Sequence, residues 1–182
     1  MTHLAEKKVA ILATDGFEDS ELTSPLETLT HHQATVDIVA PESGEITGKK
    51  GHVQQVTITT GEAVADDYDA LVLPGGVQNG DDIRLDTPAV EFVRAFFEQG
   101  KPVGVICHGG GILTDADVLT GRTLTSYPSL KTDLQNAGAT WVDEEVVVDQ
   151  GLVSSRTPKD LPAFNAKLVE EIAEGRHQGQ TA

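Results

Sequence analysis

The fold is decided by one stretch, Lys101-Pro-Val-Gly-Val-Ile-Cys-His-Gly-Gly-Gly-Ile-Leu113. The apolar run 103–106 is typical of a strand that is buried on both faces of a sheet. Cys107 and His108 follow where this strand ends, and three glycines then let the backbone turn sharply into a helix. The pattern predicts a nucleophile elbow, a tight strand-to-helix turn that presents a side chain to a cleft.

A cysteine at such a turn has a physical reason to be reactive. The N-terminus of the helix offers unpaired N–H groups and partial positive charge, which favour a thiolate and can hold an oxyanion. A thiol of pKa ~8.5 is only about 3% ionised at pH 7, whereas a pKa of about 6 would make it roughly 90% ionised. We therefore expect Cys107 to be an ionised nucleophile. The competing interpretation is an inert, buried cysteine.

Composition sets the broad class. The chain of 182 residues is long enough for a single domain, 1–182, with its own core. It carries 29 acidic and 13 basic residues, a net charge of −16, which argues against a nucleic-acid-binding face. We expect a cytoplasmic protein, because no apolar run reaches membrane-spanning length and the single cysteine suits a reducing compartment.

Strands and helices are expected to alternate along the chain, which predicts a parallel sheet covered on both faces. The expected strands are 9–13, 35–40, 70–73, 103–106, 146–148 and 152–154, with a hairpin over 45–58. The expected helices are 20–32, 88–99, 129–136 and 161–173, with a polar loop at 77–82 and a frayed tail at 176–182. Sites in such sheets form beyond the carboxyl ends of the strands.

The sequence resembles the ThiJ/PfpI superfamily, and within it the PfpI-like intracellular protease branch. The resemblance spans nearly the whole chain and is carried by motifs in order, among them Gly16-Phe-Glu-Asp-Ser-Glu-Leu22, Tyr68-Asp-Ala-Leu-Val-Leu-Pro-Gly-Gly76, Gly100-Lys-Pro-Val-Gly-Val-Ile-Cys-His-Gly109 and Thr125-Ser-Tyr-Pro128. It implies a flavodoxin-like α/β three-layer sandwich with a mostly parallel sheet, related to class I glutamine amidotransferase domains.

The resemblance also implies an active site around Cys107 as nucleophile. Glu18 is then the carboxylate beside the sulfur, although on its own it is equally a helix-start carboxylate stabilised by the helix dipole. Asp81 matches an acid that orients His108 of a neighbouring subunit, so a complete site requires a homodimer or a larger ring. The remaining expected contributors to the oxyanion hole and substrate pocket are Gly75, Gly76, Gly109 and Tyr127.

Two enzymatic functions follow from the resemblance, both in stress metabolism. In one, Cys107 adds to a small α-oxoaldehyde such as methylglyoxal, or to its adducts on proteins, and Glu18 or His108 moves the proton. In the other, the enzyme is a cysteine peptidase. We favour the aldehyde, because an elbow near a subunit contact admits small molecules more readily than a folded polypeptide. Neither chemistry needs a metal or an organic cofactor.

An alternative from a different class is a non-enzymatic redox sensor or holdase. An exposed thiol of low pKa is readily oxidised to sulfenic and sulfinic acid, and the chain has no second cysteine to resolve it. Among the histidines outside the elbow, His3, His52 and His177 carry no motif. His31 and His32 are expected to complement the dipole at a helix C-terminus, which we favour over metal binding because adjacent residues do not face together.

Overall fold

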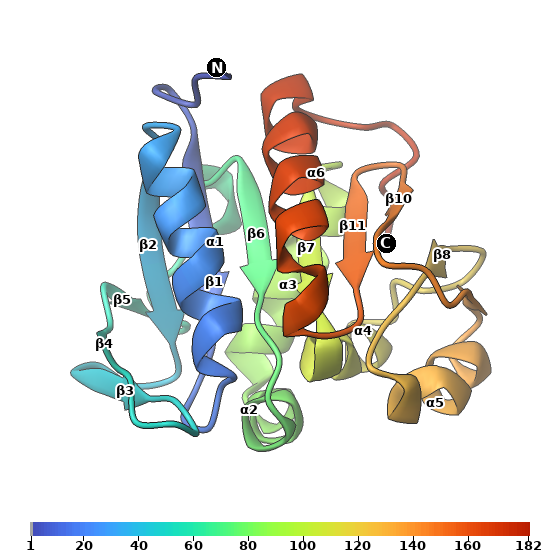
Figure 1. Ribbon diagram of the computed structural model, residues 1–182, viewed down its shortest axis with the longest axis horizontal. Coiled ribbons are helices and arrows are strands. Elements are labelled where there is room, and N and C mark those ends of the chain that lie inside the picture. The colour runs from blue at the N-terminus through green and yellow to red at the C-terminus, as the bar shows by residue number, and fades with distance from the viewer. Residues whose placement is uncertain (1) are drawn as a thin grey trace.

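The computed structural model describes residues 2–182 and shows a three-layer α/β sandwich around a seven-stranded sheet (Figure 1). The strand order is β10-β11-β7-β6-β1-β2-β5, and all neighbours are parallel except the antiparallel pair β10 and β11. The strands are β1 (Lys8–Leu12), β2 (Thr35–Ala40), β5 (Ile58–Thr59), β6 (Ala70–Leu73), β7 (Val103–Ile106), β10 (Val147–Asp149) and β11 (Leu152–Ser155). The flavodoxin-like, mostly parallel sheet expected from the sequence is confirmed.

Helices cover both faces of this sheet, as Figure 1 shows. One face carries α1 (Asp19–His31) and α6 (Leu161–Glu174), and the other carries α3 (Thr87–Glu98), α4 (Gly111–Asp115) and α5 (Lys131–Asn136). A further helix, α2 (Val77–Asp82), follows β6 at the carboxyl ends of the strands. Alternate residues of β1 belong to the two separate cores, Val9 and Ile11 to one and Ala10 and Leu12 to the other. This alternation follows from the two-residue period of a strand, and it explains why the strands are apolar throughout.

Short elements complete the described chain. An antiparallel hairpin joins β3 (Glu45–Thr47) to β4 (Val53–Gln55), as expected, and β8 (Thr123–Leu124) pairs with β9 (Thr140–Trp141). The short 3-10 helices are η1 (Ala65–Asp67), η2 (Ile83–Leu85), η3 (Cys107–Gly110), η4 (Pro128–Leu130) and η5 (Pro158–Asp160). Within residues 2–182, every helix is too short or too polar to cross a bilayer.

Two expectations about local structure are wrong. The segment 77–82 is not a loop but the helix α2, which packs against the elbow so closely that a Cβ on Gly80 would lie 2.5 Å from the His108 carbonyl oxygen. The tail 176–182 is not frayed. The His177 N–H donates to the Gly100 carbonyl (2.8 Å), and Gln180 is buried with its Nε2 donating to the Lys101 carbonyl (3.1 Å).

Adjacent glycines of the elbow differ in the space that surrounds them. A Cβ on Gly109 would lie 2.5 Å from the Leu73 carbonyl oxygen and 2.8 Å from that of Pro74, both of which are fixed in the backbone. A Cβ on Gly110 would meet nothing closer than Leu134, at 3.8 Å, and Gly110 has helical dihedrals. Only Gly109 is therefore required by the packing of η3 on the end of β6.

We predict that Gly109→Ala lowers the free energy of unfolding by about 1–3 kcal/mol, because the added methyl group overpacks a rigid site. The matched variant Gly110→Ala should be neutral or stabilise the protein by up to about 1 kcal/mol, since alanine favours a helix. Urea denaturation followed by circular dichroism measures both. Equal destabilisation by the two substitutions would contradict this account of the elbow.

Candidate active site

Cys107 lies at the turn between β7 and η3 in a backbone conformation that is unusual for a non-glycine residue. Its φ is +61°, and its side chain is only 8% exposed. Such a conformation is strained and persists only when its surroundings hold it. Here the Tyr127 N–H donates to the Cys107 carbonyl (3.1 Å), and Gly109 packs against the end of β6. The nucleophile elbow expected from the sequence is therefore present in the fold.

Three hydrogen-bonding groups of nearby residues converge on the Cys107 sulfur. The backbone N–H groups of Gly76 and His108 hydrogen-bond to it, and the His108 Nδ1 lies 3.3 Å from it. The loop after β6 comes this close because Gly75 and Gly76 carry no side chains. A Cβ on Gly75 would lie 2.8 Å from the Cys107 Cβ, and Gly76 has a φ of +92°. The predicted oxyanion donors are thus beside the sulfur.

The carboxylate beside the sulfur is Glu21, so the prediction that Glu18 occupies this place is wrong. Glu21 is completely buried, accepts a hydrogen bond from the Gly75 N–H (2.9 Å) and contacts the Cys107 thiol. Glu18 precedes α1 in extended conformation, and its two oxygens bind the ammonium groups of Lys49 (2.6 Å) and Lys50 (2.9 Å).

Burial controls the ionisation of this pair of acids. Burial raises the pKa of the Glu21 carboxyl to about 8, against the lowering effect of the Gly75 N–H. Burial and the charge of Glu21 raise the pKa of the Cys107 thiol to about 12, against the lowering effect of the His108 and Gly76 N–H groups. The lowered thiol pKa expected from the helix terminus is therefore not found. Since the two charges repel, at most one of these acids is ionised near neutral pH.

The pKa values of two neighbouring groups, Glu18 and His108, are lowered instead. Although burial raises the pKa of Glu18, the ammonium groups of Lys49 and Lys50 hold it below its usual range. Burial and the positive charge of Lys49 lower the pKa of His108, which keeps its imidazole neutral at pH 7. A neutral imidazole accepts a proton at one nitrogen, so His108 Nδ1 can take the proton of Cys107 while Nε2–H donates to Ser129 Oγ (3.3 Å).

A small cavity gives access to the sulfur. Its volume is about 200 Å³, and the His108 ring stacks on Tyr127 at its wall with a centroid distance of 4.5 Å. Tyr127 thus lines the cavity as the sequence predicted. Glu18 also lines it but is paired with Lys49 and Lys50 rather than placed beside the sulfur, and Gly109 packs on β6. The lining residues are Glu18, Glu21, Lys49, Gly76, Val77, Cys107, His108, Tyr127, Thr157 and Pro158.

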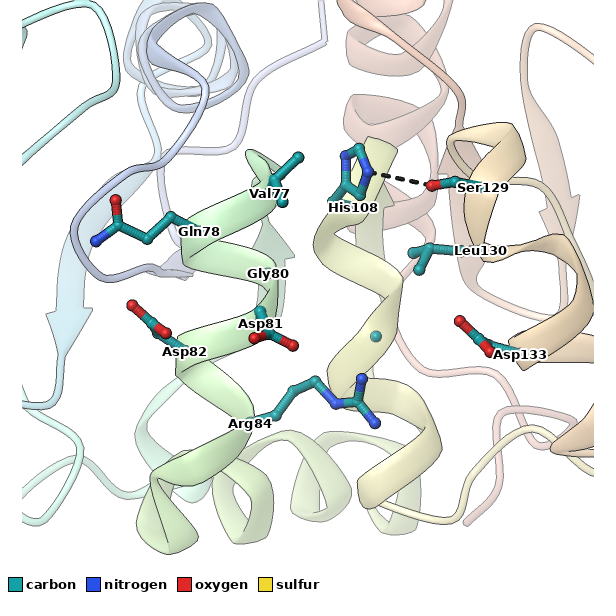
Figure 2. A pocket seen from close by; sticks show the side chains of 11 residues that line it. Val77, Gln78, Gly80, Asp81, Asp82, Arg84, His108, Ser129, Leu130 and Asp133 are labelled. Atoms are coloured by element: carbon teal, nitrogen blue, oxygen red, sulfur yellow. Dashed lines mark hydrogen bonds between the residues drawn. The ribbon is translucent and has the colours of Figure 1, made fainter.

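His108 also borders a second, outer cavity of about 490 Å³ between α2, α4 and α5 (Figure 2). Figure 2 shows Asp81 and Arg84 on one side of this cavity and Asp133 on the other, with the hydrogen bond between His108 and Ser129 across its upper end. Asp81 lines the same cavity as His108. Within the described chain, the hydrogen-bonding atoms near the imidazole are those of Cys107 and Ser129 instead.

Glu21 and Lys49 are the residues of the site that the sequence analysis missed. A signal for Glu21 was available, because it lies four residues before Pro25 and beside Leu22, on the side of α1 that is buried. Lys49 comes from the β3–β4 hairpin, and its proximity to Cys107 depends on how that hairpin folds over α1. Local sequence carries no signal for such a contact.

Comparison with known proteins identifies the family of this chain. The sequence matches the DJ-1/PfpI family over residues 7–171. The chain belongs to the DJ-1/PfpI family. Its curated relatives in this family include "Putative cysteine protease YraA" of Bacillus subtilis, 46% identical over 90% of this chain and 96% of the relative. "Protein/nucleic acid deglycase 2" of Escherichia coli is 47% identical over 90% of this chain and 96% of that protein.

Solved structures of DJ-1/PfpI proteins share the fold. A two-domain protein from Anabaena variabilis, with DJ-1/ThiJ/PfpI-like and ferritin-like domains, matches with a TM-score of 0.89 and 37% identity. That match covers 91% of this chain and 50% of the Anabaena chain. Drosophila melanogaster DJ-1beta matches with a TM-score of 0.85 and 26% identity, over 95% and 91% of the two chains. The named relatives support an enzyme of the DJ-1/PfpI type.

We predict that Glu21→Gln lowers the pKa of the Cys107 thiol, because the negative charge that opposes its ionisation is removed while a hydrogen-bonding amide remains. Thiolate absorbance during a pH titration, with Cys107→Ala as the blank, measures this shift. Glu18→Gln is the matched control, since its carboxylate is paired with two lysines. A thiol titration that moves more in Glu18→Gln than in Glu21→Gln would restore Glu18 as the partner of the sulfur.

Proposed function

We propose that the protein is a cysteine-dependent enzyme of stress metabolism that acts on small electrophilic carbonyls. The substrate class is α-oxoaldehydes such as methylglyoxal, or the early adducts that they form on proteins. One observation supports this most directly: a nucleophile, a carboxyl, an imidazole and two N–H donors converge in a cavity of about 200 Å³. The deglycase names of relatives at 46–47% identity point to the same chemistry.

In the first step, Cys107 Sγ forms a bond to the aldehyde carbon. Because the thiol pKa is raised, its proton leaves as the bond forms, and the neutral His108 Nδ1 at 3.3 Å is placed to accept it. The aldehyde oxygen gains that proton and becomes the hydroxyl of a hemithioacetal. Before the proton arrives, the N–H groups of Gly76 and His108 stabilise the developing oxyanion.

In the second step, the hydrogen on the attacked carbon moves as a proton to the neighbouring ketone carbon, while the hydroxyl proton of the hemithioacetal passes to the ketone oxygen, so that the attacked carbon becomes a carbonyl and the ketone becomes a hydroxyl. Glu21 and His108 are the groups that can carry it, and the product is a lactoyl thioester on Cys107. Water then cleaves the thioester, which releases lactate and restores the thiol. The sum is methylglyoxal plus water giving lactate, so no oxidant or cofactor enters the balance.

A cysteine peptidase is the second enzymatic candidate, because a relative of 46% identity is named a putative cysteine protease. In that reaction an acyl-thioenzyme would form and His108 would protonate the leaving amine. The size of the cavity favours the aldehyde. A peptide segment with flanking residues needs more room on both sides of the reacting carbon, and pockets for larger ligands measure about 300–1,000 Å³.

We predict that the wild-type protein converts methylglyoxal to lactate and that Cys107→Ala does not. His108→Ala should lower kcat by about 10²–10⁴-fold, the contribution of a positioned proton carrier. Lactate detection at equal protein concentrations measures both variants.

Two other results would contradict the proposal. Consumption of one methylglyoxal per chain without lactate would mean that the thiol only scavenges aldehydes. Peroxide-driven addition of two oxygens to Cys107, together with no turnover of any aldehyde, would favour the redox sensor or holdase instead.

The proposed assembly is a homodimer or larger ring in which Asp81 of one subunit approaches His108 of the next. Asp81 and His108 line the same outer cavity, and the exposed apolar side chains of Val77 and Leu85 belong to the neighbouring segment. An acid near the imidazole would favour its protonated form during turnover.

Subunit complementation tests this arrangement. Asp81→Ala and Cys107→Ala should each have little activity alone. After mixing and subunit exchange, about a quarter of the wild-type activity should return, because half of the dimers are mixed and each holds one complete site. Proven mixed dimers without recovered activity would show that Asp81 acts within its own subunit or not at all.

A further inference from the structure

Three donor atoms converge at the end of α6, outside the cavities described above. They belong to Glu171, Glu174 and His177 and all lie within 4.8 Å of one another. His177 Nε2 is 2.9 Å from Glu171 Oε2 and 3.6 Å from Glu174 Oε2. Among residues 2–182, this is the only group of three or more such side chains whose donor atoms converge in this way.

The chain holds these groups in place by several independent contacts. Glu171 and Glu174 are three residues apart and so share one face of the last turn of α6. Gly175 ends the helix with a φ of +88°, which turns the chain back. The His177 N–H then donates to the Gly100 carbonyl (2.8 Å), and its ring packs against Gly151.

The buried members of this cluster lack the hydrogen bonds that their burial requires. Glu171 is only 7% exposed, yet its Oε2 has no hydrogen-bond partner, and the buried His177 Nε2 has none either. Although the two atoms are 2.9 Å apart, their contact lacks hydrogen-bond geometry. An unsatisfied buried polar atom is costly, so a third group that bound both atoms would relieve that cost.

We propose that Glu171, Glu174 and His177 form a site for a divalent transition-metal ion, with Zn²⁺ the best match. Zinc binds imidazole nitrogen and carboxylate oxygen at about 2.0–2.2 Å in tetrahedral geometry, which places two ligand atoms about 3.4 Å apart. The observed separations of 2.9 and 3.6 Å lie on either side of that value. Two carboxylates balance the charge of the ion, and the imidazole disfavours Ca²⁺ and Mg²⁺, which prefer oxygen ligands.

The site is open to solvent on one side. The Glu174 side chain is 62% exposed, so an ion can enter there and complete its coordination with water. The ammonium group of Lys167, on the same helix, forms an ion pair with Glu170 (2.9 Å), which is not one of the proposed ligands. The negative end of the α6 dipole adds to the attraction for a cation.

This site and Cys107 lie at opposite ends of strand β7. Gly100, which accepts the His177 N–H, precedes β7, whereas Cys107 follows it. In Figure 1 the end of α6 is at the top of the view, and α2, which packs on the elbow, is at the bottom. The proposed metal therefore takes no part in the reaction at Cys107. It ties the C-terminal segment to α6 and to the turn before β7.

Calorimetric titration with Zn²⁺ tests the proposal. The titrations use the wild-type chain and Cys107→Ser, which removes the thiol as a competing ligand. We expect one site per chain in Cys107→Ser. Adding Glu171→Gln, Glu174→Gln or His177→Gln should each weaken binding at least ~10-fold, a loss that even outer-shell partners of a metal can cause. His31→Ala, at the exposed end of α1, is the matched control and should bind as tightly as its parent.

Two further readouts separate a metal site from a simple ion pair. Saturating Zn²⁺ should raise Tm by about 5 °C or more at a hundredfold excess over Kd, and this rise should be lost in the three variants. Co²⁺ should give the visible absorption of a tetrahedral or five-coordinate site. Absence of binding in Cys107→Ser, or undiminished binding in both His177→Gln and the exposed Glu174→Gln, would overturn the proposal and leave a histidine–glutamate ion pair.

Discussion

The left-handed backbone of Cys107 is the constraint on which the rest of the site depends. A φ of +61° turns the chain from β7 directly into η3, and this turn exists only because backbone from β6 can approach without side chains in between. Gly75 and Gly109 make that approach possible on two sides of the sulfur. The parallel pairing of β6 with β7 then places the Gly76 N–H where it meets the sulfur.

This tight packing also determines the electrostatics. A thiol enclosed so closely loses its hydration, and the buried Glu21 beside it adds repulsion, so both acids hold their protons to higher pH than usual. The same enclosure lowers the pKa of His108 and leaves a neutral acceptor at the sulfur. Helix-terminus N–H groups favour the thiolate but do not outweigh burial. Reactivity in this arrangement depends on proton transfer during the attack rather than on a thiolate that is already formed.

Much of the architecture was predictable, because it depends on patterns that are local in sequence. Apolar runs that end in glycines mark β6 and β7, and their alternation with helices predicts the parallel sheet. The identity of the carboxyl partner was only partly predictable in this way, because the helical spacing marks Glu21 as buried but does not show that Glu18 is held away from the sulfur. Glu18 and Glu21 stand in one short motif, and the choice between them depends on the hairpin that brings Lys49 to Glu18. Helix α2 and the docked tail likewise form through tertiary contacts, since neither has an apolar period of its own.

The two edge strands of the sheet limit how copies of the chain can associate. One edge strand, β5, has two residues, and the other, β10, has three and runs antiparallel to its neighbour. Such short edges offer too few free N–H and C=O groups to template a further strand. The large negative net charge adds general repulsion between copies. Extension of the seven-stranded sheet across subunits is therefore disfavoured, and side chains rather than the backbone of its edge strands would determine the partner.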